Sequence, residues 1–148
     1  MSEIKDRLTA DMKNAMREGN KDRLATIRLI LAAAKQVEVD QRIDLQDADL
    51  LAILDKMSKQ RRDSIEQFEQ AGRTDLADKE KAELAIIGEF LPAALTEDEI
   101  SDLVKQAIQQ TSASSMKDMG SVMAILKPQL QGRADMAAVS QLVKASLN

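Results

Sequence analysis

Apolar residues recur three or four positions apart along almost the whole chain, and strict alternation of apolar and polar residues is absent. This spacing places apolar side chains on one face of a helix, whereas alternation is typical of a strand. The pattern predicts four helices within residues 1–92, the second of them fraying between Val37 and Leu45, where the apolar positions thin out. The predicted helix boundaries are marked by residue types that commonly start or end helices: Ser2, Gly19, Asn20, Asp47, Gly72, Thr74 and Pro92.

A second set of helices is predicted after Pro92. Thr96 and Glu99 form a capping box, in which each side chain bonds the backbone N–H of the other residue. The later boundaries are a polar linker over residues 111–115, Pro128 and Gly132 between two short helices, and Asp135 as the cap of the last helix. The sequence therefore predicts an all-α protein, with an N-terminal helical bundle of about four helices in residues 1–92 and a small three-helix C-terminal module in residues 93–148.

The residue types that the chain lacks restrict its chemistry. It has no Cys and no His, and its only aromatic residues are two Phe. Disulfides, thiolate nucleophiles and histidine bases are therefore excluded, and a zinc site would have to consist of carboxylates alone. No apolar run approaches the roughly 20 residues that span a bilayer, and the N-terminus lacks the apolar stretch of a secretory signal. We expect a soluble cytoplasmic protein that has no membrane association, catalytic residue, metal or cofactor.

A ridge of basic residues on the third predicted helix is the first candidate site. The net charge of the chain is −4, so the molecule as a whole does not attract nucleic acid and only a local patch would do so. Lys56, Lys59 and Arg62 fall on the helix face opposite Leu50 and Leu54. The ridge is suited to contact with phosphates. The alternative is a solvated face without a partner, which is the common role of a charge run.

Arg61 and Glu80 interrupt the apolar stripes of the third and fourth helices. If these helices form an antiparallel hairpin across Gly72, the two side chains lie within about one turn of each other. We therefore predict a semi-buried Arg61–Glu80 ion pair that sets the register of the hairpin. The alternative, a catalytic role for Glu80, lacks a second carboxylate or a nucleophile on the same face.

The C-terminal module contains a second candidate site. Gly132 and Arg133 precede the last helix, where free backbone N–H groups attract anions. Gly120 costs about 1 kcal/mol relative to Ala inside a helix, which indicates a close approach by another helix or by a ligand. The other cations available to a phosphate in this module are Lys117, Lys127 and Lys144.

Several segments of the chain resemble one known family. They are Arg23–Arg28, Lys59–Ser64, Ala71–Ala77, Met119–Met123 and Gly132–Asp135. Together they resemble the GatB/YqeY family of small helical proteins, which is similar to the C-terminal tail of the B subunit of tRNA-dependent amidotransferases. The resemblance implies a module that helps to hold tRNA by its outer corner. Since the stretches at Met119–Met123 and Gly132–Asp135 both belong to the C-terminal module, it implies that tRNA contact should be sought there first. The ATP-binding, metal-binding and ammonia-handling parts of the amidotransferase core have no match, so the carbon–nitrogen ligase reaction is not implied.

Two functions fit these observations. The first, which we favour, is a non-catalytic accessory module that binds tRNA by its shape and backbone, as folded RNA is commonly recognised. The second is an adaptor that docks on an aminoacyl-tRNA synthetase or an amidotransferase without direct RNA contact. Its docking surface would consist of Met116, Met119, Met123 and Met136, a type of stripe that otherwise forms an adaptable core. A third function, an independent amide-transferring enzyme, needs reactive groups that the chain does not display.

Overall fold

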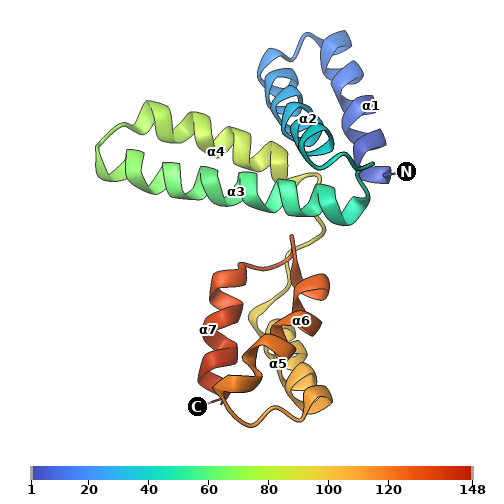
Figure 1. The fold of residues 1–148 in the computed structure, drawn as a ribbon. Coiled ribbons are helices and arrows are strands. Elements are labelled where there is room, and N and C mark those ends of the chain that lie inside the picture. The colour runs from blue at the N-terminus through green and yellow to red at the C-terminus, as the bar shows by residue number, and fades with distance from the viewer. Residues whose placement is uncertain (1, 148) are drawn as a thin grey trace. The chain divides into compact units, whose positions relative to one another are not determined.

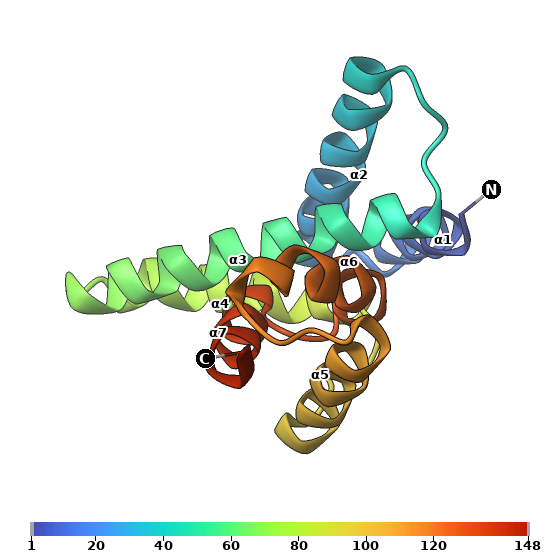
Figure 2. The ribbon, with the colours of Figure 1, turned by 60° about the horizontal axis from the view of Figure 1, so that its bottom comes forward.

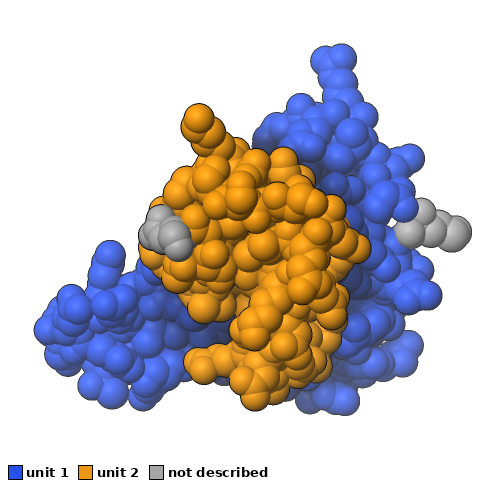
Figure 3. All heavy atoms as spheres, turned by 90° about the horizontal axis from the view of Figure 1, so that it is seen from below, with its two compact units in different colours: residues 1–92 blue, residues 93–148 orange. Residues whose placement is uncertain are grey.

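The computed structural model describes residues 2–147, and all regular structure among these residues is helical. The predicted all-α class is confirmed. The chain forms two compact units, residues 1–92 (unit 1) and residues 93–148 (unit 2), which Figure 3 shows in different colours. None of the described helices is both long enough and apolar enough to cross a lipid bilayer.

Unit 1 consists of two helical hairpins. The first pairs α1 with α2, and the second pairs α3 with α4 (Figure 1). The bounds are α1 Glu3–Glu18, α2 Lys21–Gln41, α3 Asp47–Gln70 and α4 Thr74–Gly88. Two glycines at positive φ, Gly19 at 70° and Gly72 at 71°, make the two hairpin turns, because a residue without a Cβ adopts this conformation at little cost.

The core of unit 1 lies where the two hairpins meet. Its buried apolar side chains are Ile4, Leu8, Ile27, Ile30, Ala34, Leu45, Leu50, Leu54, Met57, Ile87 and Phe90. Between Ser58 and Ile87, only Ala77 is buried among the residues of α3 and α4. The tip of the α3–α4 hairpin accordingly extends away from α1 and α2, as Figures 1 and 2 both show.

Unit 2 packs three helices around a smaller core. The bounds are α5 Glu97–Thr111, the short 3₁₀ helix η1 Met116–Asp118, α6 Met119–Leu130 and α7 Met136–Leu147. The buried apolar side chains are Val104, Ala107, Val122, Leu126, Leu130, Val139, Val143 and Leu147. Met119, Met123 and Met136 pack against this core, whereas Met116 is exposed. Most of the methionine stripe therefore fills the core of the unit instead of forming an open surface.

Most helix boundaries agree with the sequence pattern. The hydroxyl of Ser2 accepts a hydrogen bond from the N–H of Lys5, and the Thr96–Glu99 capping box is present at the start of α5. The carboxylate of Asp135 accepts a hydrogen bond from the N–H of Ala137 at 3.1 Å, so this residue caps α7 as expected.

Three boundaries differ from the expectation. Thr74 is the first residue of α4, and the preceding Arg73 occupies the cap position without a capping side-chain bond. The same helix ends at Gly88, before the expected stop at Pro92. Pro128 lies inside the last turn of α6, where its missing N–H removes one helical bond without ending the helix.

Candidate functional site

Three exposed cations follow one face of α3. We call Lys56, Lys59 and Arg62 the cationic row, and all three side chains are exposed. Successive members are three residues apart, which places them about 4.5 Å apart along the helix axis. None of them takes part in the ion pairs found among residues 2–147. The row therefore presents positive charge that the fold does not use.

Arg61, in the middle of this segment, points inward instead. Its Nε lies 3.8 Å from a carboxylate oxygen of Glu80 and donates a hydrogen bond to Glu83 at 3.3 Å. The three side chains are mostly buried, with exposed fractions of 16% for Arg61, 25% for Glu80 and 17% for Glu83. The structure thus shows a bridge from α3 to two carboxylates of α4. The sequence analysis missed Glu83, which lies on the same face of α4 as Glu80, three residues further on. Its premise that this face holds no second carboxylate was therefore wrong.

A second arginine cluster joins both hairpins of unit 1. Arg23 on α2 contacts Glu89 at 2.6 Å and Asp11 at 3.3 Å, and its hydrogen bond to Glu89 raises the pKa of this guanidinium. Arg7 lies over the ring of Phe90 at 5.4 Å from its centroid and donates a hydrogen bond to the carbonyl of Glu89. Through these contacts Arg7 and Arg23 help to hold the two hairpins of unit 1 together. The sequence analysis did not single them out as a cluster.

The turn before α7 does not have the anion-binding geometry that the sequence analysis expected. Gly132 adopts φ 79°, but the N–H groups of Arg133 and Ala134 both donate to the carbonyl of Leu130. The carboxylate of Asp135 occupies the start of α7. The N–H groups of Arg133, Ala134 and Ala137 are therefore already bonded, and the carboxylate of Asp135 places a negative charge at the start of the helix.

The side chain of Arg133 also contributes to the fold. Its Nε donates a hydrogen bond to the carbonyl of Ala93 at 3.2 Å, and its own carbonyl accepts one from the N–H of Leu95 at 2.9 Å. Arg133 therefore holds the first residues of unit 2 against the turn before α7.

The other candidate residues of unit 2 are open to solvent. Lys117, Lys127 and Lys144 have exposed side chains. Gly120 is exposed as well, and a Cβ added there would meet no atom within 4 Å. The close helix approach expected at Gly120 is therefore absent from the described part of the chain.

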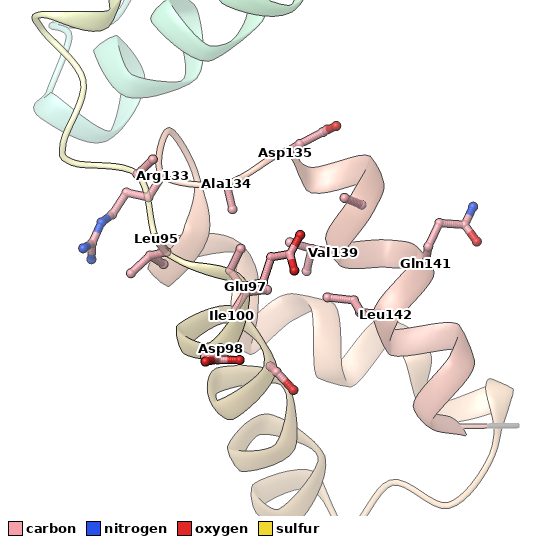
Figure 4. Close-up of a pocket in the computed structure, with 13 residues that line it drawn as sticks. Leu95, Glu97, Asp98, Ile100, Arg133, Ala134, Asp135, Val139, Gln141 and Leu142 are labelled. Atoms are coloured by element: carbon pink, nitrogen blue, oxygen red, sulfur yellow. The ribbon is translucent and has the colours of Figure 1, made fainter.

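A groove that the sequence analysis did not predict lies between the start of α5 and α7 (Figure 4). Its volume is about 880 Å³, and the apolar part of its lining consists of Ala94, Leu95, Ile100, Ala134, Ala138, Val139 and Leu142. Glu97, Asp98 and Asp135 line it as well, together with Arg133. Leu142 keeps an exposed fraction of 42%, which is high for a leucine. The groove combines an apolar floor with a largely acidic rim.

Neither surface resembles a metal site. Among residues 2–147, no group of three or more carboxylates has an arrangement that suits a metal ion. The two surfaces that distinguish the molecule, the cationic row and the groove, are instead suited to binding another molecule.

These features define a small all-α protein with an exposed cationic row on α3 and a groove between α5 and α7. The chain belongs to the YqeY family, because the family described as Yqey-like protein matches residues 5–147. The resemblance to the YqeY proteins is thereby confirmed.

The curated relatives of the chain include proteins named "Altered inheritance of mitochondria protein 41, mitochondrial". The protein of Pyrenophora tritici-repentis is 36% identical over 130 residues, which cover 86% of this chain and 71% of the relative. The protein of Lachancea thermotolerans is 34% identical over 118 residues, or 75% of this chain and 63% of the relative. That of Clavispora lusitaniae is 36% identical over 110 residues, or 72% and 64%. The chain thus spans less than two thirds of the length of two of these relatives.

The expectation of a cytoplasmic protein is contradicted by these relatives, which are named as mitochondrial proteins. The expectation rested on the lack of an apolar N-terminal stretch, and that criterion detects only secretory signals. Mitochondrial transit segments are amphipathic and rich in Arg and Ser, so the criterion does not respond to them.

Proposed function

We propose that the chain is a non-catalytic tRNA-binding accessory module, related to tRNA-dependent amidotransferase systems, that contacts the RNA backbone through the cationic row of α3. The observation that carries the proposal is the row itself. Lys56, Lys59 and Arg62 are exposed along one face of α3 and take no part in the ion pairs found among residues 2–147, in a chain that otherwise has an excess of acidic residues. Membership of the YqeY family is consistent with it, since the resemblance of the sequence segments implies a likeness to the tRNA-holding tail of the amidotransferase B subunit.

The rest of the surface favours contact with the backbone over contact with bases. Stacking of unpaired bases needs exposed aromatic rings. The two Phe do not provide them, since Phe90 is buried in the core and Phe68 is partly buried on the inner side of the α3–α4 hairpin. Recognition by shape and by phosphate contacts, which is common for folded RNA, is the mode that these residues support.

The lysines of unit 2 are a second set of candidate phosphate contacts. Lys117, Lys127 and Lys144 are exposed and have no partner among the ion pairs of residues 2–147. Arg133 differs from them because its Nε is bonded to Ala93, and removing this side chain would disturb the turn as well as the charge. The lysines therefore test RNA contact more cleanly than Arg133 does.

The experiment measures the affinity of the full chain for total tRNA, by fluorescence anisotropy at roughly 50 and 200 mM salt. The triple variant Lys56→Ala, Lys59→Ala, Arg62→Ala removes the row. The control variant Lys13→Ala, Arg17→Ala, Lys21→Ala removes the same amount of charge from exposed positions of α1 and α2. We expect the row variant to bind more weakly and to lower the slope of log K against log salt by about one unit per lost phosphate contact.

The control variant should retain most of the affinity of the parent chain for tRNA. Its affinity should depend more steeply on salt than that of the row variant. Equal losses in the two triple variants would mean that only net charge matters, and the proposed site on α3 would be wrong. Unchanged affinity in the row variant, combined with weaker binding after Lys127→Ala, would place the contact in unit 2.

A further inference from the structure

The groove of unit 2 is separate from the residues that the proposed function uses. We infer that it binds an amphipathic helix of a partner protein, with an apolar stripe that covers Leu142 and Ile100 and with Lys or Arg residues beside the stripe. This inference does not depend on RNA binding.

The first support is that α7 has two apolar faces. Val139, Val143 and Leu147 are buried in the core of unit 2. Ala138 and Leu142 lie on a different face, one helical turn apart, and line the groove. A helix that packs only against its own unit needs a single apolar stripe. The exposed second stripe of α7 is therefore available to pack against another helix.

The second support is the shape of the site. The start of α5 and the first half of α7 flank the groove, and Ile100 contributes to its floor from α5 (Figure 4). A helix laid between them would complete a four-helix arrangement from the three helices of unit 2. Helix-in-groove binding uses apolar anchors at i, i+3 or i+4 and i+7, which match a floor formed by single apolar residues on two neighbouring helices.

The third support is the acidic charge of the rim, which favours a partner helix with basic residues. Glu97 and Asp98 lie in the first turn of α5, and Asp135 precedes α7. The only cation that lines the groove is Arg133, whose Nε is bonded to Ala93 and whose guanidinium extends away from Val139 and Leu142 in Figure 4. A rim of this sign attracts a basic segment and repels the phosphates of RNA.

The probe is a synthetic helical peptide of about 18 residues, long enough to form helix on contact, with Leu at helical spacing on one face and Lys on the other. A second peptide has the same Leu positions with Glu in place of Lys. Each is titrated into the ¹⁵N-labelled full chain, and the shifts of the backbone amides are followed. We expect the Leu/Lys peptide to shift amides near Ile100, Ala138 and Leu142 in a saturable manner, and to bind at least tenfold more tightly than the Leu/Glu peptide.

Two substitutions and two controls test the parts of the groove separately. Leu142→Glu should weaken binding of the Leu/Lys peptide at least tenfold, whereas Leu29→Glu, at an equally exposed leucine of unit 1, should not. The double variant Glu97→Gln, Asp98→Asn should reduce the affinity severalfold and flatten its salt dependence. Asp102→Asn, on α5 but outside this groove, should have little effect.

Three results would overturn the inference. The first is equal binding of both peptides, or shifts confined to other surfaces. The second is self-association of the free chain that Leu142→Glu abolishes, which would make a second copy the occupant. The third is a set of shifts around Leu142 on addition of tRNA alone, which would make the groove an RNA site. Failure of tRNA binding to the cationic row would leave the peptide result unaffected, so the two proposals fail separately.

Discussion

The two units differ in how they use charged side chains. Every ion pair among residues 2–147 lies in unit 1, including the bridge from Arg61 to α4 and the contacts of Arg23. Unit 2 holds its helices together by apolar packing and by capping bonds, with no ion pair among its described residues. Four of these ion pairs lie in the outer part of the α3–α4 hairpin, which has almost no buried apolar residues. We therefore expect charges to contribute to the register of this hairpin.

The largest expected effect concerns the apolar core of unit 2. Leu126→Ala removes a fully buried side chain from α6 and should cost about 3–4 kcal/mol of the free energy of unfolding, within the range for buried leucines. Hydrogen exchange of the α5–α7 amides measures the loss. Leu142→Ala, at an exposed position, is the control and should cost much less. Similar losses in the two variants would contradict the assignment of the core.

The second effect concerns the charged bridge of unit 1. Arg61→Ala leaves Glu80 and Glu83 without their partner at mostly buried positions, and we expect a loss of about 2–3 kcal/mol, below the value for a fully buried pair. Urea unfolding followed by circular dichroism measures it. Arg62→Ala changes the neighbouring exposed position, and its free energy of unfolding should lie within about 0.5 kcal/mol of that of the parent chain. A loss at Arg61 no larger than at Arg62 would show that charges do not set the register.

The third effect is a pH dependence that originates in unit 1. The hydroxyl of Ser2 and the N–H of Ile4 donate to the carboxylate of Asp47, and these bonds lower the pKa of Asp47. A lowered pKa means that the stabilisation is present above the unfolded pKa near 4 and is lost as the pH falls through the folded pKa. Asp47→Ala should therefore cost about 1–2 kcal/mol at neutral pH and less near pH 3.

Urea midpoints at pH 7 and pH 3 measure this difference. Asp22→Ala, in the exposed first turn of α2, is the matched control. It should change the urea midpoint less than Asp47→Ala does, both at pH 7 and at pH 3. A cost at Asp47 that is the same at both pH values would contradict the charged contact.

The smallest effect concerns a capping bond of unit 2. Thr96→Ala removes the hydroxyl that accepts a hydrogen bond from the N–H of Glu99, and we expect a loss of about 1 kcal/mol. The same hydroxyl donates to the carboxylate of Glu99 at 3.1 Å, so the loss includes both bonds of the Thr96 side chain. Exchange protection in the first turns of α5 measures it, with Ser121→Ala on the exposed side of α6 as the control. No loss of protection would show that α5 starts without this cap.

The parts of the structure that were predictable depend on neighbours in the sequence. Ser2, Gly19 and the Thr96–Glu99 box act within one helical turn, so their spacing alone indicates where helices start and end. The features that were missed join distant positions. The contact between Ser2 and Asp47 spans 45 residues, and that between Arg133 and Ala93 spans 40.

The candidate site divides in the same way. The cationic row was predictable, because three cations on one helix face follow from helical spacing. The groove depends on how α5 packs against α7, and the single-helix pattern of Leu142 gives no sign of that packing. The anion site expected before α7 rested on free backbone N–H groups, whereas those of Arg133 and Ala134 bond back to the carbonyl of Leu130.

We propose that the cationic row of α3 binds RNA, whereas the ion-paired side chains of unit 1 maintain the fold. The most direct measurement is a titration of the ¹⁵N-labelled full chain with total tRNA. We predict line broadening and shifts at Lys56, Lys59 and Arg62 and at their exposed neighbours on α3, with the amides near Ile100 and Leu142 unaffected. A spectrum that is unchanged along α3, or changes that spread evenly over both units, would contradict the claim.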